Sequence, residues 1–361
     1  MPSNLRVPGP TPVPPDVAQA GARPMVNHRG PEFAAVMRDI ITGLKPFFGC
    51  AGDPLLLTGS GTGAQEAAIV NMLSPGDDVV AVVGGVFGAR FADIAAAFGA
   101  SVRRVDIAWG QAARPEVVAA ALQPLPRAVI LTHNETSTGV TNDIAALAAA
   151  IRAVSSETLI IVDGVSSIGA LPFELDHWDV DVVITGSQKA WMSPPGLAMV
   201  AVSERGWEAF RQATMPRYYW DFGKARKNGA NGTTPFTPAV GVAFALQEAL
   251  RQMLAEGPEN VFARHRTIGS LLREGVQDLG LELFAEPAAA SNTVTAVQVL
   301  DDVDAGALLR GLRERHGVVV GSGQDWLKGR IFRVGHMGFV REEDVEAVLR
   351  ALRTELATAA A

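Results

Sequence analysis

Runs of consecutive apolar residues, many of them β-branched, recur between about Asp53 and Ser203, and alanine-rich amphipathic stretches separate them. Continuous apolar runs of this kind are typical of strands buried on both faces of a sheet. They predict strands at Leu55–Ser60, Val79–Val83, Ser101–Ile107, Ala128–Asn134, Leu159–Asp163, Asp181–Thr185 and Ala198–Ser203. The stretches between them have helical spacing and predict helices at Gly63–Leu73, Phe87–Phe98, Pro115–Leu122 and Asp143–Val154. This alternation indicates an α/β domain on one mostly parallel, seven-stranded sheet.

The pattern changes at Lys224–Pro238, where Gly, Asn, Thr and Pro predict a loop before a long helix at Val240–Glu256. The remaining chain has the pattern of a smaller α+β domain. Its predicted helices are Asn260–Leu279, Asp304–His316 and Glu342–Thr358, and its predicted strands are Leu281–Phe284, Val294–Leu300, Val318–Gly321 and Ile331–Val334. We therefore expect an N-terminal segment at 1–20, a large domain at 21–238, and a linking helix with a small domain at 239–361.

Composition narrows the classes of partner. Hydrophobic residues make up 48% of the chain and charged residues 19%, which is typical of a folded protein. The net charge of −7 argues against nucleic acid or an anionic membrane as partner. No apolar run reaches the roughly 18 residues of a membrane span, and the N-terminus lacks the pattern of a signal peptide, so we expect a cytoplasmic protein. The single cysteine, Cys50, and six scattered histidines predict neither a disulfide nor a metal site.

Candidate chemistry lies just after the predicted strands, because ligands of open α/β sheets bind at the carboxyl ends of the strands. The turn Thr58–Ala64 is rich in glycine and hydroxyl groups and opens a helix, which suits a phosphate. Gly59, Gly61 and Ala64 also fit a dinucleotide-binding pattern, but the next strand ends in two glycines instead of an acidic residue. A plain strand-to-helix turn is the remaining alternative.

Three further residues have chemistry that suits one cofactor. Asp163 ends an apolar strand, where a carboxylate needs a cation unless it only caps the next turn. Lys189 is one of only five lysines; it lies between Ile184 and Trp191, where a sheltered amine can act as a nucleophile. Phe87 offers a ring for stacking if it is not simply core. A phosphate site, an aromatic face, a carboxylate and an amine are the parts that pyridoxal 5′-phosphate requires.

Three motifs follow one another in the order of a known family: Val162–Ser167, Gly186–Lys189 and Pro194–Gly196. With them, nearly the whole chain resembles the class V aminotransferases of fold type I, in the alanine:glyoxylate and serine:pyruvate branch. The resemblance implies that Lys189 forms the Schiff base with the cofactor and that Asp163 pairs with its pyridinium nitrogen. It assigns the remaining cofactor contacts to Ser60, Gly61, Thr62, Phe87, Thr136, Gln188, Thr234 and Thr237.

The resemblance also implies how substrate and subunits are arranged. Arg333 resembles the arginine that binds the substrate carboxylate, and the segment around Gly9 resembles a loop that closes over the substrate. Thr234 and Thr237 stand where relatives complete the phosphate site of the neighbouring subunit, which implies a homodimer with shared active sites. Phe87 replaces the tryptophan of many relatives, so stacking remains while an indole N–H is lost.

The expected activity is a ping-pong transfer of an amino group from alanine or serine to glyoxylate or pyruvate. A cysteine desulfurase-like lyase is an alternative, but it needs a mobile cysteine in the C-terminal half, and Cys50 is far from there. A non-catalytic subunit with this fold is disfavoured because Lys189, Asp163 and Arg333 are all present. Four residues are candidates for the substrate pocket, each with a structural alternative: Arg29, Tyr218, Tyr219 and Trp220.

Overall fold

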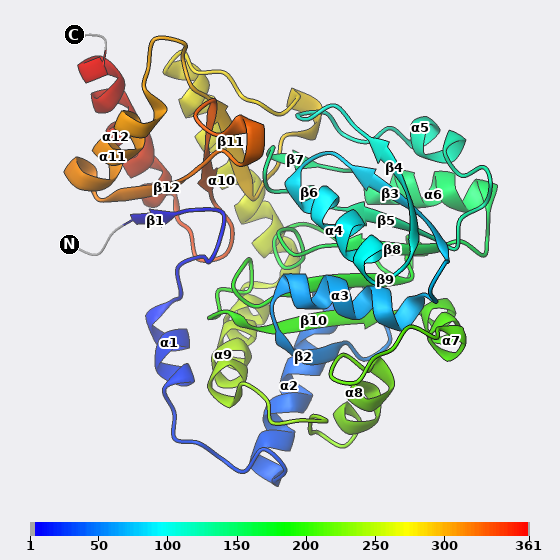
Figure 1. Cartoon of the computed structure of the whole chain (residues 1–361). Helices are drawn as coiled ribbons and strands as arrows, with labels where there is room; N and C mark the ends of the chain where they lie inside the picture. Colours follow the sequence, from blue (N-terminus) through cyan, green and yellow to red (C-terminus); the bar gives the residue numbers. More distant parts are fainter. Residues whose placement is uncertain (1–3, 360–361) are drawn as a thin grey trace.

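A seven-stranded sheet is the centre of the computed structural model, which describes residues 4–359 (Figure 1). Its order is β2-β10-β9-β8-β5-β3-β4, and β10 is the strand that runs antiparallel to its neighbours. The strands are β2 (Leu55–Gly59), β3 (Asp78–Val83), β4 (Ser101–Asp106), β5 (Ala128–Thr132), β8 (Leu159–Asp163), β9 (Val182–Gly186) and β10 (Gly196–Val202). All seven predicted strands are therefore present, and they form the one sheet that the sequence predicts.

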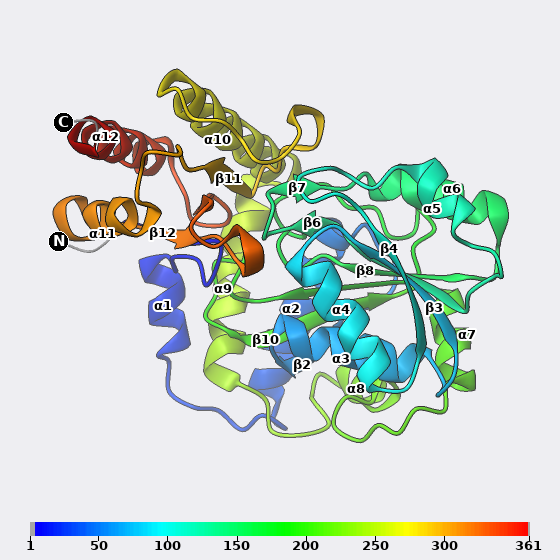
Figure 2. The same ribbon diagram turned by 45° about the horizontal axis from the view of Figure 1, so that its top comes forward.

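Helices cover both faces of this sheet, which explains the continuous apolar strands (Figure 2). Alternate strand residues point into two hydrophobic clusters. One face packs on α3 (Gly61–Met72), α4 (Val86–Ala97), α7 (Glu204–Gln212) and α8 (Phe222–Gly229). The other packs on α2 (Pro31–Phe48), α5 (Pro115–Ala120), α6 (Ile144–Val154) and α9 (Val240–Glu256). A small ribbon of β6 (Asn134–Glu135) and β7 (Val140–Thr141) lies beyond β5.

A second sheet, of four strands in the order β1-β12-β13-β11, belongs to the C-terminal part of the chain. Its strands are β1 (Asn4–Arg6), β11 (Val294–Gln298), β12 (Val318–Ser322) and β13 (Ile331–Gly335). Its helices α10 (Pro258–Asp278), α11 (Ala305–His316) and α12 (Glu342–Ala359) share a hydrophobic cluster with it. Short 3₁₀ turns lie at Pro287–Ala289 and Asp325–Leu327. The first described residues of the chain therefore belong to this C-terminal sheet, because β1 pairs in parallel with β12.

Several elements differ from the sequence prediction. Helices α1 (Pro15–Gly21), α2 and α7 and strand β1 are not predicted, although the apolar residues of α2 follow helical spacing. The predicted strand Leu281–Phe284 is wrong, because only Leu283 forms an isolated bridge to β11. The predicted loop Lys224–Pro238 begins inside α8, whose first turn the Asp221 carboxylate caps by accepting from the Lys224 N–H at 2.9 Å. Residues 1–3 and 360–361 of the predicted domains lie outside the described residues.

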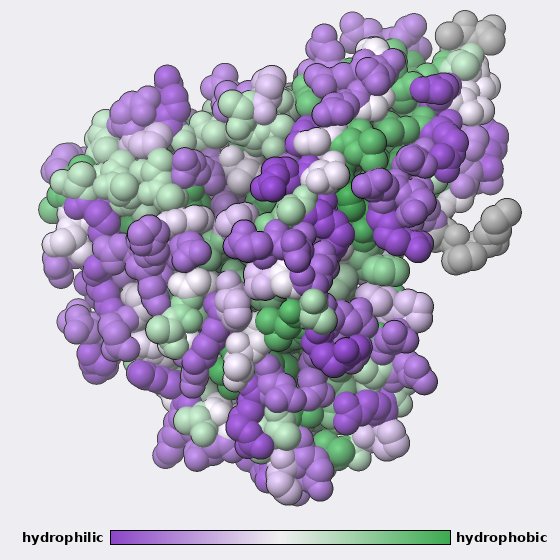
Figure 3. Space-filling model, turned by 180° about the vertical axis from the view of Figure 1, so that it is seen from behind, coloured by the Kyte–Doolittle hydropathy of each residue, from purple (hydrophilic) through white to green (hydrophobic). Residues whose placement is uncertain are grey.

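The surface is mixed in character. On the face drawn in Figure 3, hydrophilic side chains cover most of the area, and hydrophobic residues gather in smaller patches between them. Among the helices of residues 4–359, none is long and apolar enough to cross a membrane.

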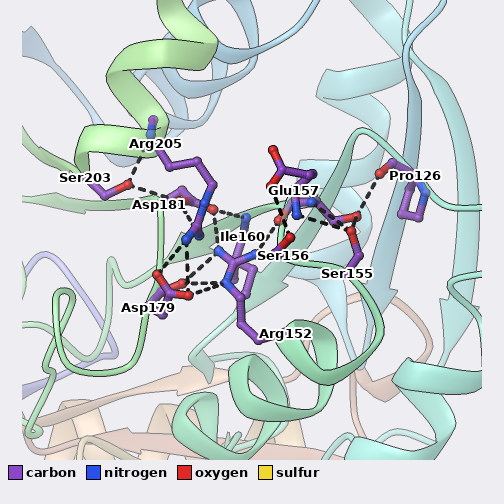
Figure 4. A network of polar contacts seen from close by, with 12 residues as sticks. Pro126, Arg152, Ser155, Ser156, Glu157, Ile160, Asp179, Asp181, Ser203 and Arg205 are labelled. Carbon is purple, nitrogen blue, oxygen red and sulfur yellow. Dashed lines mark hydrogen bonds and ion pairs between the residues drawn. The ribbon is translucent and has the colours of Figure 1, made fainter.

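A buried ion-pair network fixes the sheet at the edge where β9 begins (Figure 4). The side chain of Asp181 is fully buried, and its oxygens accept from Arg152 at 2.7 Å, Arg205 at 3.1 Å and Ser203 Oγ at 3.0 Å. The Ile160 N–H donates to the same carboxylate at 2.8 Å. Because every oxygen has charged or polar partners, this buried charge holds β8, β9 and β10 in register. The opposite edge of the sheet is left for the candidate site.

Candidate active site

The carboxyl ends of β2, β3, β5, β8 and β9 meet at one edge of the large sheet. Thr132 of β5 is in register with Asp163 of β8, and Asp163 is in register with Ile184 of β9. Asp163 ends β8, and the segments that follow β2, β3 and β9 carry Ser60, Phe87 and Lys189. The topology therefore brings together the four groups that the sequence placed after separate strands.

Asp163 is buried at the end of β8 and is only 4% exposed. Its Oδ2 accepts a hydrogen bond from Gln65 Nε2 at 2.7 Å, and its Oδ1 accepts from the Val165 N–H at 2.9 Å. Burial raises the pKa of this carboxyl to about 6, against the opposing effect of the Val165 hydrogen bond. Gln65, on α3, is a site residue that the sequence analysis missed, because a glutamine inside a helix carries no distinctive pattern.

Lys189 follows β9, and its amine lies close enough to Asp163 for the charge of that carboxylate to act on it. Burial lowers the pKa of this amine to about 8; the charge of Asp163 opposes this shift, and the charges of Arg333 and Arg90 add to it. The amine donates to the carbonyl oxygen of Pro8 at 2.5 Å. A lysine that is partly neutral near physiological pH is suited to nucleophilic attack on a carbonyl carbon.

The glycine-rich turn after β2 forms the amino end of α3, a 12-residue helix. Ser60 is its N-cap, and its Oγ accepts from the Gly63 N–H at 3.3 Å. The N–H groups of Gly61 and Thr62 have no hydrogen-bond partner among residues 4–359 and can therefore bind an anion. A Cβ on Gly61 would lie 2.7 Å from Val165, so a larger residue would close the space beside Asp163. The turn thus has the geometry of a phosphate site close to the carboxylate and the amine.

Gln188 supplies an independent sign that this space holds a ligand. Its Oε1 is buried and has no hydrogen-bond partner among the described residues. Burial of a polar atom without a hydrogen-bond partner costs free energy, so we expect a ligand group to donate a hydrogen bond to this oxygen. The residues at this edge therefore fit a phosphate-bearing cofactor with a ring that reaches Asp163.

Phe87 lies in the first turn of α4, and the Arg90 guanidinium lies 4.9 Å from the centroid of its ring. The Glu135 carboxylate accepts from the N–H groups of Phe87 at 3.1 Å and Gly88 at 3.0 Å. Because these are orphan N–H groups of a helix start, Glu135 acts as the cap that α4 lacks from its own N-cap residue. Glu135 and Arg90 were both outside the predicted site. Glu135 directly follows the predicted strand Ala128–Asn134 but was not singled out there, and Arg90 lies inside a helix, where no motif marks it.

Thr136 is buried, and its hydroxyl donates to Ser166 Oγ at 2.8 Å. Its carbonyl oxygen accepts from Arg333 Nη1 at 3.2 Å, which joins the β5 loop to β13 of the second sheet.

Arg333 is 7% exposed, and its three hydrogen-bond partners among the described residues are neutral oxygens: Thr136 O, Ser322 O and Gln324 Oε1. Among the ion pairs of the described residues none involves Arg333, although the charge of the Glu135 carboxylate acts on its guanidinium from a longer distance. A buried guanidinium of this kind is suited to an external anion.

The N-terminal segment lies against the Lys189 loop. The Thr11 N–H donates to Gln188 O at 3.0 Å, and the Thr11 hydroxyl donates to Lys189 O at 2.9 Å. A Cβ on Gly9 would lie 2.5 Å from Lys189 Nζ, and Gly9 has φ of +134°, so only glycine fits this approach. Gly9 therefore lies against the Lys189 amine, while closure of this segment over the substrate stays a prediction.

Other predicted residues lie outside this cluster. Arg29 is exposed, Tyr218 is 73% exposed, and Tyr219 stacks on Phe236 at 5.1 Å. Trp220 packs against Gly59 and Gly63, where it supports the glycine-rich turn from outside.

Thr234 and Thr237 make no side-chain hydrogen bond to the glycine-rich turn within the part of the chain that the structure describes. Thr234 Oγ1 donates to Phe236 O within its own loop at 2.7 Å, and Thr237 is exposed. Cys50 lies before β2, at the other end of this strand from the glycine-rich turn, and burial raises the pKa of its thiol to about 12. A thiol held protonated at that end of the sheet is unsuited to the desulfurase alternative. The described residues contain no group of three or more side chains suited to a metal ion.

Comparison with known proteins identifies the family. The family model described as Aminotransferase class-V matches residues 15–348. A protein named soluble hydrogenase, small subunit, from Synechococcus sp. is 43% identical over 98% of this chain and 92% of its own length. L-Aspartate–glyoxylate aminotransferase from Paracoccus denitrificans is 38% identical over 92% of this chain and 85% of its own length. The crystal structure of an alanine–glyoxylate aminotransferase from Nostoc sp. superposes with a TM-score of 0.94, 34% identity, and coverage of 99% of this chain and 96% of that chain.

These matches confirm the predicted fold type, the aminotransferase activity and the pyridoxal 5′-phosphate cofactor. The match spans both sheets and the loops that carry the candidate site, so it concerns the same residues that the geometry brings together. The chain belongs to the class V aminotransferase family.

Proposed function

We propose that this aminotransferase takes its amino group from a small amino acid, alanine or serine, and gives it to a small 2-oxo acid, glyoxylate or pyruvate. The observation that carries the proposal is Arg333, a buried guanidinium with neutral partners next to Thr136 and the Lys189 amine. One carboxylate is the feature that all four substrates share. The cytoplasmic location and the domain boundaries rest on the sequence.

The cofactor supplies an aldehyde carbon that condenses with an amine and a ring that accepts electrons from the substrate Cα. With the cofactor bound, Lys189 would anchor it at rest, and once the substrate amine takes that place its neutral amine would take up the Cα proton. Asp163 would hold a proton on the pyridine nitrogen. The N–H groups of Gly61 and Thr62, with the Ser60 hydroxyl, would bind the phosphate.

Phe87 would supply a ring face for stacking, Thr136 and Gln188 would supply polar contacts, and the Gly9 segment would close over the substrate.

A dicarboxylic donor such as aspartate is the second candidate, and one observation favours it. Arg90 lies over the Phe87 ring, and its charge lowers the pKa of Lys189, so the site has a second cation besides Arg333. The Paracoccus denitrificans relative is named for L-aspartate as donor. Arg29, a candidate for the substrate pocket in the sequence analysis, is exposed in the single chain and gives no support to a dicarboxylic donor.

The substrate proposal is tested by a half-reaction screen, in which each amino acid is added to the holoenzyme and loss of the cofactor absorbance is followed. We expect alanine and serine to react fastest. Arg333→Ala should raise the Michaelis constants of donor and acceptor together by about tenfold or more, because a charge-assisted hydrogen bond contributes roughly 1.5–3 kcal/mol. Aspartate or glutamate reacting ten times faster than alanine would show that the small-substrate proposal is wrong.

We further propose a homodimer in which Thr234 and Thr237 complete the phosphate site of the partner subunit. Phe236, in the loop that carries them, stacks on two exposed rings from the segment before α8: Tyr218, 73% exposed, at 5.7 Å and Tyr219, 45% exposed, at 5.1 Å. Exposed aromatic clusters of this kind are enriched at interfaces between subunits.

Dilution of the holoenzyme to monomer should therefore release the cofactor, as measured by light scattering alongside bound-cofactor absorbance. Thr237→Ala should weaken cofactor binding several-fold, whereas Thr354→Ala, an exposed change on α12, should not. A monomer that retains its full cofactor content would contradict the shared site.

A further inference from the structure

Gln324 is the one side chain, among the described residues, that accepts a hydrogen bond from Arg333. Its Oε1 accepts from Arg333 Nη1 at 2.9 Å. The other two acceptors, Ser322 O at 2.9 Å from Nε and Thr136 O at 3.2 Å from Nη1, are backbone carbonyls. A backbone oxygen held in a strand or a buried loop cannot leave without moving the fold, whereas a glutamine side chain can rotate away.

The loop around Gln324 holds this residue in place. The Leu327 N–H donates to Gln324 O at 3.0 Å, and the Gly323 N–H donates to Ile331 O at 3.0 Å. Leu327 is buried, and next to it the ring of Trp326 lies 5.3 Å from that of Trp109, which follows β4 of the large sheet. The loop is therefore held by its own backbone hydrogen bonds and by packing on the large sheet, and it keeps Gln324 beside Arg333.

The hydrogen bonds of Arg333 leave Nη2 without a partner among the described residues. A carboxylate that binds an arginine in bidentate fashion needs donors from two nitrogens, so it needs Nη2 together with Nε or Nη1. Both of these nitrogens already donate to protein oxygens. A bidentate substrate therefore has to displace an acceptor, and Gln324 is the acceptor that can move.

We propose that Gln324 is an affinity-determining residue: a neutral occupant of Arg333 that competes with the substrate carboxylate and yields to it. This inference rests on the proposed function insofar as Arg333 binds the carboxylate of both substrates. Gln324 keeps the guanidinium oriented and satisfied between turnovers, and as a neutral group it is displaced more easily than a carboxylate would be. It thereby sets the Michaelis constants of donor and acceptor together and has little effect on turnover at saturation.

The test compares Gln324→Glu and Gln324→Leu in the holoenzyme. Gln324→Glu places an internal carboxylate on Arg333, so the Michaelis constants of donor and acceptor should both rise by about tenfold or more, while kcat changes by less than about threefold. Gln324→Leu removes the competitor and should lower both constants several-fold. Gln277→Glu, which adds the same charge on an exposed position of α10, should change neither.

Binding of propionate, an unreactive monocarboxylate with the carbon skeleton of alanine, separates this inference from the substrate proposal. Titration calorimetry on the holoenzyme should give weaker binding in Gln324→Glu, tighter binding in Gln324→Leu and none in Arg333→Ala. These results do not depend on which amino acid is the donor. Unchanged propionate affinity in Gln324→Glu, or weaker binding in Gln324→Leu, would overturn the inference, the second result because it would show that Gln324 only holds Arg333 in position.

Discussion

Replacement of Lys189 by alanine is expected to reduce kcat by at least about 10⁴-fold, because in the roles proposed above Lys189 is both the covalent anchor of the cofactor and the base that removes the Cα proton. A positioned base contributes up to about 10⁴-fold, which corresponds to about 5.5 kcal/mol of barrier. The fold should persist, since the Lys189 amine makes a single hydrogen bond, to Pro8 O. Steady-state kinetics at saturating substrate measure the loss.

The identity of the anchoring amine can be checked directly. Borohydride reduction of the holoenzyme, followed by peptide mass spectrometry, should place the pyridoxyl group on Lys189. Lys227→Ala, at an exposed lysine of α8, is the matched control and should retain both labelling and activity. A label on Lys45, Lys224, Lys227 or Lys328 instead would refute the assignment.

The pH dependence of cofactor capture follows from the shift at Lys189. Burial lowers the pKa of this amine to about 8, and only the neutral amine attacks the aldehyde. The rate at which the apoenzyme takes up the cofactor should therefore rise with pH and level off above about pH 8. A lysine with its ordinary pKa would still show a rising rate at pH 10, so the position of the plateau distinguishes the two cases.

The large sheet was predictable because each of its strands is buried on both faces, so that the apolar run itself marks the strand. The strand β1 shows the opposite case: three residues at the edge of a sheet, Asn4–Arg6, have no period that could identify them. Their position depends on a pairing with β12, more than 300 residues away in the chain, and no local pattern encodes such a pairing.

The candidate site shows the same division. Asp163 and Lys189 were identifiable because polar groups directly after apolar strands are costly unless they are used. Glu135 and Gln65 act through contacts with other loops, namely the start of α4 and the Asp163 carboxylate, and these contacts exist only in three dimensions. Arg29 illustrates the converse case, since a local motif makes it a candidate for the substrate pocket and the fold leaves it exposed in the single chain.

Asp163→Asn is expected to lower turnover by about a thousandfold, equivalent to about 4 kcal/mol of barrier, while the protein stays folded and yellow. A neutral amide cannot hold a proton on the pyridine nitrogen through the step that places negative charge on the ring. The amide can still accept one of the two hydrogen bonds that Asp163 receives from Gln65 and Val165, so the fold loses little.

Asp181→Asn provides the control for this change, because Asp181 is also a fully buried aspartate beside the same sheet. Its partners are Arg152, Arg205 and Ser203 at the opposite edge, so the substitution leaves buried cations less well paired and should lower the thermal midpoint. Turnover per folded molecule should stay within about threefold of the parent, because nothing at that edge touches the reacting atoms. We expect Asp163→Asn to lose activity with an unchanged thermal midpoint, and Asp181→Asn to lower the thermal midpoint with nearly unchanged turnover. This pair of results would separate an effect on the reaction from an effect on stability. Near-normal turnover in Asp163→Asn would instead mean that this carboxylate only caps the turn at Val165.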